Sequence, residues 1–221
     1  MNIHIKKVIA VLLPVFLAGV QYCAAQTPAD YRKVVTERSA KIINTLGITD
    51  SVQYNKVLNQ LADQYVSVNT IHDAGKAAIS AIRDQGLSKE DMDEAIKKQE
   101  SKKAAELRQL HGAFVAGLEK NLTADQIEKI KDGMTYRVFP VTYTAYQDMI
   151  PSLTAAQKDK IYGWLKEARE LAMDEGSSED KHKVFGKYKG RINNYLSSEG
   201  YDMKKEEKAW QQRIKESQSK G

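Results

Sequence analysis

Signals for the start of a helix recur along this chain, and they constrain its fold more than any other feature. The pattern Leu-Thr-x-x-Gln occurs twice, at Leu122–Gln126 and at Leu153–Gln157. In each copy the threonine hydroxyl can accept a hydrogen bond from the glutamine amide, while the glutamine side chain can bond back to the threonine amide. Such a reciprocal capping box marks a helix N-terminus, so the two copies predict two helices.

Other residues that favour the first turn of a helix precede apolar residues at helical spacing elsewhere in the chain. They predict helix starts at Thr27, Thr49, Ser88, Pro140, Ser178 and Asp202. The segment 133–150 also has the composition of a strand, and a short helix is the interpretation we favour. Without a Pro- or Gly-rich linker, residues 26–221 are expected to form one all-α domain, a bundle of about six to seven helices.

The second and third expected helices are unusually long. The apolar stripe that follows Thr49 keeps its period nearly to Gly86, which corresponds to about 50 Å of helix. The third helix begins with a capping box at Ser88 and Asp91. Its first half, residues 89–103, is mostly charged, so we expect this half either to project into solvent or to lie over another surface.

The first 25 residues have the pattern of a secretory signal peptide. Lys6 and Lys7 precede an uncharged apolar run over residues 8–20, which is too short to span a membrane. Cleavage is expected after Ala25, and Tyr22 before Cys23 argues against a lipoprotein signal. We therefore expect a protein of the periplasm or the extracellular space, with no membrane anchor after cleavage.

The composition of the expected mature chain excludes several classes of chemistry. The full sequence has 34 Lys and Arg against 29 Asp and Glu, a net charge of +5. Loss of the signal peptide removes two lysines and the one cysteine. A chain without cysteine has no thiol nucleophile, thiolate metal ligand or disulfide. Its small positive charge does not predict a nucleic-acid partner.

A tract of cations and aromatic rings over residues 181–201 is the strongest candidate for a binding site. Cations pair with carboxylates or phosphates, and ring faces can stack on a sugar or a base. A core face with a solvated cationic side is the alternative interpretation, because several of the rings share one helical face. The predicted ligand-binding residues are Lys187, Tyr188, Lys189, Arg191, Tyr195 and Tyr201.

A second aromatic group is compatible with either a sugar site or a hydrophobic core. Rings at such helical spacings occur more often in cores. The group consists of Tyr136, Phe139, Tyr143, Tyr146, Tyr162 and Trp164.

No catalytic residue, metal ligand or cofactor is predicted. Glu179 and His182 have the spacing of a di-iron ligand pair, but such a site needs a second pair that the chain lacks. No glycine-rich phosphate loop or nucleophile elbow is present. The paired carboxylates of a glycosidase are defined by their separation in space, which a sequence does not reveal. We therefore favour a non-enzymatic role and keep a glycan lyase or hydrolase as an alternative.

The doubled Leu-Thr-x-x-Gln pattern is similar to a motif of the periplasmic Spy and CpxP proteins. Those proteins are small helical dimers shaped as cradles, and Spy is an ATP-independent chaperone. The present chain is longer and carries the 181–201 tract, which that pattern lacks. This resemblance implies a periplasmic chaperone or stress adaptor, and it leaves a homodimer open.

A second resemblance extends over nearly the whole mature chain. The runs Gly176–Ser178, Phe185–Leu196 and Gly200–Asp202 resemble a family of uncharacterised exported proteins of Bacteroidota, a domain of unknown function. Its members often lie beside genes for polysaccharide degradation, and some are labelled sugar-binding. This resemblance implies an exported accessory protein of polysaccharide use that binds carbohydrate, and the cations at Lys187, Lys189 and Arg191 add an acidic glycan as the expected ligand.

Overall fold

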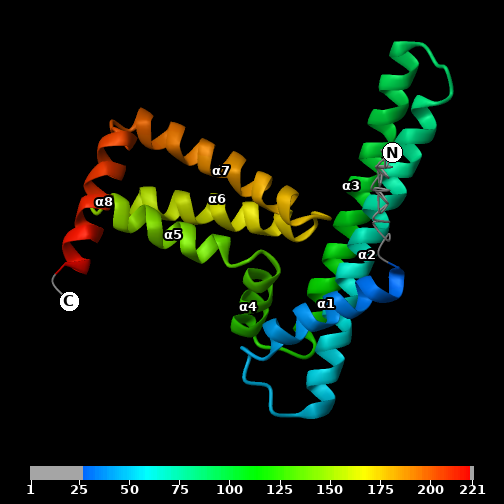
Figure 1. Cartoon of the computed structure of the whole chain (residues 1–221), viewed down its shortest axis with the longest axis horizontal. Helices are drawn as coiled ribbons and strands as arrows, with labels where there is room; N and C mark the ends of the chain where they lie inside the picture. Colours follow the sequence, from blue (N-terminus) through cyan, green and yellow to red (C-terminus); the bar gives the residue numbers. More distant parts are fainter. Residues whose placement is uncertain (1–26, 220–221) are drawn as a thin grey trace, which may run out of the picture.

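The computed structural model describes residues 27–219, and this range folds into helices joined by short turns (Figure 1). The all-α architecture is confirmed, with slightly more helices than expected, and residues 1–25, for which a signal peptide is predicted, lie outside the described residues. The eight helices of this range are α1 (Pro28–Ile43), α2 (Ser51–Arg83), α3 (Lys89–Glu119), α4 (Ala124–Met134), α5 (Val138–Met149), α6 (Ala155–Met173), α7 (Ser178–Ser198) and α8 (Met203–Gln218).

Both Leu-Thr-x-x-Gln motifs form the expected capping boxes, at the starts of α4 and α6. Thr123 Oγ1 accepts from the Gln126 amide at 3.3 Å, and Gln126 Oε1 accepts from the Thr123 amide at 3.0 Å. The side-chain amide of Gln126 also donates to the carbonyl of Leu46, and that of Gln157 donates to Glu199. Each motif thus both begins a helix and ties it to a segment distant in the chain.

Two helix starts differ by one residue from the prediction. Asp50, rather than Thr49, caps α2, and Ser177, rather than Ser178, caps α7. In both places two adjacent polar side chains can serve as the cap, and the sequence pattern does not discriminate between them.

The segment 133–150 is helical, so its strand-like composition is overridden. Helix α5 begins at Val138, two residues before the expected Pro140. Tyr136 and Arg137 precede it with φ angles of 57° and 58°, the left-handed region. This conformation is unfavourable for residues with a side chain. It lets the chain turn sharply from α4 into α5.

The first half of the chain is built on the antiparallel hairpin of α2 and α3, the long arm in Figure 1. Helix α1 packs against α2, and α4 packs against α1 and α3. Their apolar faces form one buried cluster, which includes Val35, Ile43, Leu61, Leu118, Ile130 and Met134.

The outer part of this hairpin projects away from the rest of the molecule (Figure 1). The last buried residue of α2 is Gly75, and the first buried residue of α3 is Phe114. The charged half-helix 89–103 therefore projects into solvent, which was one of the two expected arrangements. No helix within residues 27–219 combines the length and apolar character needed to cross a membrane.

The second half of the chain forms another arm, in which α6 packs against α5 and α7. Its buried cluster includes Phe139, Ile150, Ile161, Leu165, Phe185 and Ile192. Helix α8 contacts α5 and α7 and lies across the end of this arm (Figure 1).

The two arms are joined through a buried cation on α6. Arg169 is fully buried, and its guanidinium donates to Glu128 at 2.6 Å and to Asp132 at 2.7 Å, both on α4. Burial alone would lower the pKa of Arg169, but these hydrogen bonds raise it above its usual value. Helix α4 is thus fastened to the second arm by paired charges.

The end of α6 is fastened to the first arm in the same way. His111 on α3 lies 3.0 Å from the Asp174 carboxylate and 3.4 Å from that of Glu170. Hydrogen bonds to these two acids raise the pKa of His111 to about 9.

Within the second arm, the amine of buried Lys181 on α7 donates to the carbonyls of Ala172 and Met173 at the last turn of α6. Burial lowers the pKa of Lys181 to about 8.

Candidate functional site

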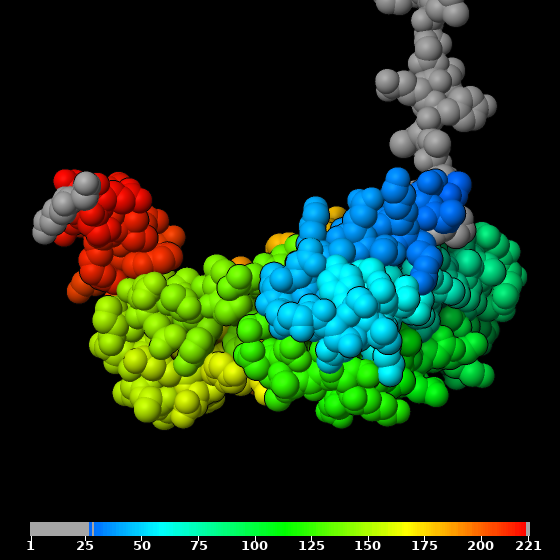
Figure 2. All heavy atoms as spheres, turned by 90° about the horizontal axis from the view of Figure 1, so that it is seen from below, coloured from blue at the N-terminus to red at the C-terminus, as the bar shows by residue number. Residues whose placement is uncertain are grey.

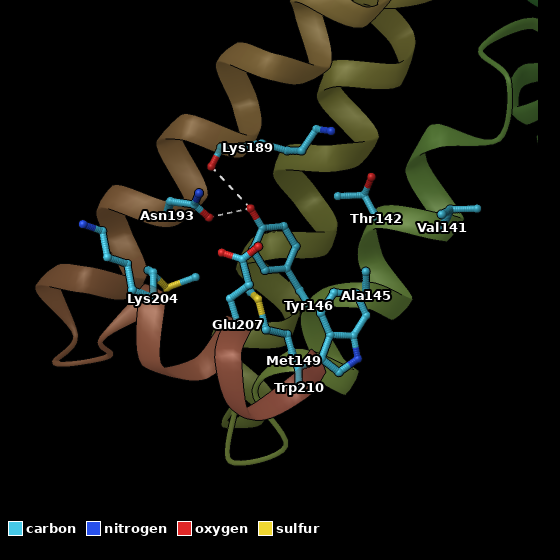
Figure 3. A pocket seen from close by; sticks show the side chains of 11 residues that line it. Val141, Thr142, Ala145, Tyr146, Met149, Lys189, Asn193, Lys204, Glu207 and Trp210 are labelled. Carbon is cyan, nitrogen blue, oxygen red and sulfur yellow. Dashed lines mark hydrogen bonds between the residues drawn. The ribbon is translucent and has the colours of Figure 1, made fainter. Parts of the chain in front are cut away.

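A hollow of about 610 Å³ opens between α5, α7 and α8, and we call it the α8 groove. Figure 3 shows side chains from all three helices lining it. Apolar side chains, among them Val141, Ala145 and Met149, contribute part of the lining. The aromatic and polar part consists of Thr142 and Tyr146 from α5, Lys189 and Asn193 from α7, and Lys204, Glu207 and Trp210 from α8.

Tyr146 connects the α5 and α7 walls of the α8 groove. Its hydroxyl donates to Asn193 Oδ1 at 2.7 Å and lies 3.4 Å from the carbonyl oxygen of Lys189 (Figure 3). Burial raises the pKa of Tyr146 to about 12, so the hydroxyl stays protonated at neutral pH. Because the Asn193 oxygen accepts from Tyr146, its NH₂ group remains available to donate to a ligand.

The third wall comes from one face of α8. Met203, Glu207 and Trp210 are spaced i, i+4 and i+7, and all three line the α8 groove. The guanidinium of Arg213, one turn further on, donates to the carbonyls of Asp148 and Met149 at 2.8 and 3.0 Å. These carbonyls belong to the last turn of α5, where unpaired acceptors favour a cation. The contact fixes α8 beside α5.

The chemistry of the α8 groove suits a polar ligand with one apolar face. Trp210 offers aromatic surface, while Asn193, Lys189 and Glu207 offer donors and acceptors from opposite walls. A concave site with aromatic lining and a few converging polar groups is typical of small-ligand recognition. A pyranose has this character, since its C–H groups pack on rings and its hydroxyls pair with amides and charges.

The predicted residues of the 181–201 tract lie on two sides of α7. Tyr188, Arg191 and Tyr195 face α6. The Arg191 guanidinium lies 4.5 Å from the centre of the Trp164 ring and 3.8 Å from Glu167. Tyr195 meets Trp164 edge-on at 5.4 Å. Burial, together with a hydrogen bond to Glu167, raises the pKa of Tyr188 to about 12.

The other predicted residues of the tract are placed differently. Lys189 lines the α8 groove, and Lys187 is exposed on α7. The Tyr201 hydroxyl donates to Gln157 Oε1 at 3.0 Å, which links the α7–α8 turn to the start of α6. The structure thus brings three of the six predicted residues together beside α6 and only Lys189 into the α8 groove.

Four members of the second aromatic group, Phe139, Tyr143, Tyr146 and Trp164, belong to the core of the second arm, whereas Tyr136 and Tyr162 are exposed. Phe139 and Tyr146 are buried. Phe139, Tyr143 and Tyr162 pack on one another with ring centres 5.0–6.4 Å apart. Tyr146 is the member that also reaches the α8 groove.

Sequence reasoning missed the residues of α8, although a signal for them exists. The i, i+4, i+7 spacing of Met203, Glu207 and Trp210 puts a ring and a carboxylate on one helix face. Nothing in the sequence states which surface this face meets, because that depends on the contact of Arg213 with α5.

The charged groups between the two arms form a second concentration of titratable residues, and these serve the fold. Burial alone would raise the pKa of Glu170, but hydrogen bonds from His111 and Lys131 hold it at about 2. Arg169 is paired as well, with Glu128 and Asp132. Among residues 27–219, no group of three or more His, Cys, Asp or Glu side chains is arranged to hold a metal ion.

Comparison with known proteins places the chain in a family. A family model described as "Protein of unknown function (DUF3826)" matches residues 32–216, which is most of the chain. A search of the curated proteins found no match.

Proposed function

The chain belongs to the DUF3826 family of unknown function, and we propose that it is an exported, non-enzymatic accessory protein that binds carbohydrate in the α8 groove. The expected membership of an uncharacterised family is thereby confirmed. The export and the sugar ligand that the resemblance implied are part of the proposal.

One observation carries this proposal: Trp210 and Tyr146 share the α8 groove with the fixed amide of Asn193. The volume of about 610 Å³ is within the range of small-ligand sites. The groove is open on one side, so a sugar unit can enter while it remains part of a longer chain.

The lining of the α8 groove favours binding over hydrolysis. Glycosidases use two carboxyl groups on either side of the scissile bond. Among the described residues, Glu207 is the one carboxylate that lines this groove. Tyr146 is a poor general base, because its pKa of about 12 lies far above neutral pH. A binding role accounts for both residues without a catalytic step.

The proposal is tested by equilibrium binding of the purified protein to a panel of neutral and acidic glycans. Trp210→Ala is expected to abolish binding. Trp164→Ala removes a ring from the α6–α7 surface and serves as the matched control, with binding retained. Undiminished binding by Trp210→Ala would show that the α8 groove is not the site. New reducing ends or unsaturated products after long incubation would show that the protein is a hydrolase or lyase.

An exposed apolar surface in and beside the α8 groove favours a periplasmic chaperone as the second candidate. Val141 on α5 is 63% exposed, and Tyr136 is 42% exposed. Such residues could hold an unfolded segment. The purified protein would then slow the aggregation of an unfolded client at substoichiometric concentration. Failure to do so, together with saturable glycan binding, would leave carbohydrate recognition as the function.

A further inference from the structure

The α8 groove is one end of a longer trough. A hollow of about 420 Å³ shares Val141, Ala145 and Trp210 with it. A third hollow, of about 510 Å³, shares Arg137 and Pro140 with the second. Because neighbouring hollows have residues in common, the three form one continuous depression along the surface of the molecule.

Helix α5 forms the floor of this trough, and α8 and α1 stand at its two ends. Figure 2 shows the surface hollowed between the two raised ends, α8 in red and α1 in blue. The 12 residues of α5 span about 18 Å at the usual rise of an α-helix. The trough is therefore long enough for a chain of several sugar units.

The two ends of the trough differ in charge. At the α8 end, Lys189 and Lys204 are balanced by Glu207 and Asp148. At the other end, between α1, α4 and α5, the lining contains three cations and one acid. These are Lys41, Lys129, Arg137 and Asp132.

The acid at this cationic end is paired with a buried cation that it shares with Glu128 and Glu170. Asp132 accepts from the buried guanidinium of Arg169 at 2.7 Å. Lys129 pairs with Asp125 one turn away on the exposed surface of α4. Among residues 27–219, neither Lys41 nor Arg137 has an acid within salt-bridge distance. This end of the trough thus presents two cations, Lys41 and Arg137, that are not paired with a carboxylate.

The backbone places Arg137 at the joint between the second and third hollows. Both Tyr136 and Arg137 have left-handed φ angles, and the Arg137 amide donates to the Asp132 carbonyl at 2.7 Å. Unfavourable backbone of this kind persists where surrounding contacts maintain it, and it is concentrated at functional sites. Here it presents a guanidinium to the floor of the trough.

From this arrangement we propose that the ligand is an extended anionic oligosaccharide. Its neutral part lies against Trp210 in the α8 groove, and its carboxylate or sulfate groups lie over Lys41 and Arg137. Guanidinium and ammonium groups recognise such anions by charge-assisted hydrogen bonds. This inference rests on the proposed function and specifies the length and the charge of the ligand.

The experiment compares two ligand series of increasing length, oligogalacturonates and neutral galacto-oligosaccharides, from the disaccharide to the hexasaccharide. The affinity for oligogalacturonates is expected to rise with length and to fall as salt screens the charges. The variant Lys41→Gln/Arg137→Gln should weaken hexasaccharide binding by about 3- to 10-fold at low salt and leave disaccharide binding unchanged. Lys97→Gln/Lys98→Gln, on the projecting hairpin, is the charge-matched control.

The outcomes separate this inference from the proposed function. Equal affinity for short and long oligogalacturonates, or equal loss in both double variants, would overturn the extended anionic ligand and leave the sugar site in place. A neutral series that binds as tightly as the acidic one would also overturn it. Absence of binding to every sugar, combined with capture of an unfolded polypeptide, would overturn the proposed function itself.

Discussion

The hydroxyl of Tyr146 on α5 donates to the side-chain oxygen of Asn193 on α7 at 2.7 Å, and this bond connects two walls of the α8 groove. Tyr146 is buried, whereas Asn193 is exposed to the groove. The tyrosine therefore positions a polar group that a ligand can reach.

Loss of this hydroxyl should weaken both the fold and ligand binding. Tyr146→Phe is expected to lower the free energy of unfolding by about 0.5–1.5 kcal/mol, the usual contribution of a hydrogen bond. Glycan affinity should fall several-fold, because the Asn193 amide is no longer held in one orientation. Titration calorimetry checks this, with Tyr143→Phe on the same helix as control. Equal affinities for the two variants would refute the positioning role.

The buried guanidinium of Arg169 is expected to be essential for joining the two arms. Arg169→Met leaves Glu128 and Asp132 without their cation, which should cost about 3–5 kcal/mol of the free energy of unfolding. Arg191→Met removes an exposed cation beside Trp164 and should cost about 1 kcal/mol or less. Denaturant unfolding measures both. Similar losses in the two variants would contradict the assigned role of Arg169.

Stability should decline as the pH rises from 6.5 to 8. His111 has a pKa of about 9 in the folded protein against 6.5 in the unfolded chain, so the folded state binds more protons in this interval. Its stabilising contribution is complete below pH 6.5 and is lost as the pH rises through 9. Glu170, with a pKa of about 2, stays ionised throughout. Above pH 8, deprotonation of buried Lys181 acts in the opposite direction.

The expected loss over this interval is about 1–2 kcal/mol in the free energy of unfolding. Thermal unfolding at constant ionic strength is the measurement. His111→Gln should remove the pH dependence, since Asp174 and Glu170 then face a neutral side chain. A variant that kept the original dependence would assign the effect to another group.

Two glycines offer a test of the packing between α1 and α4. A Cβ atom on Gly133 would lie 2.8 Å from Cγ1 and Cγ2 of Ile42, too close for either to remain in place. Gly133→Ala should therefore destabilise the protein by about 1–3 kcal/mol. Gly163 on α6 has open space at the same position, and Gly163→Ala should stabilise by about 0.5–1 kcal/mol. Opposite signs in chemical denaturation confirm the contact; equal signs refute it.

The helices were predictable because their starting signals are local. Thr123 with Gln126, and Thr154 with Gln157, contain within four residues all that a capping box needs. The one-residue errors at Thr49 and Ser178 arose where two neighbouring side chains can serve as the cap. Segment 138–149 is a helix despite its strand-like composition, because the helical form buries Phe139 and Tyr146 against α6 and α7.

The candidate site was not predictable in the same way, because it depends on contacts between distant helices. The aromatic and cationic residues of α7 were recognised, but the sequence does not show that Arg191 and Tyr195 face α6 while Lys189 faces α8. Similarly, the sequence alone does not show that Arg169 is buried, because its partners Glu128 and Asp132 lie on another helix, α4.

The central claim, that sugars bind in the α8 groove, is tested most directly by tryptophan fluorescence. The chain has two tryptophans. Trp210 lines the α8 groove, whereas Trp164 belongs to α6 and lies beside Arg191, on the side of α7 that faces α6. In Trp164→Phe, Trp210 alone reports, and titration with an acidic oligosaccharide should give a saturable change that weakens with salt. In Trp210→Phe, the remaining Trp164 should stay silent. A saturable change from Trp164 with silence from Trp210 would contradict the account and move the site to the α6–α7 surface.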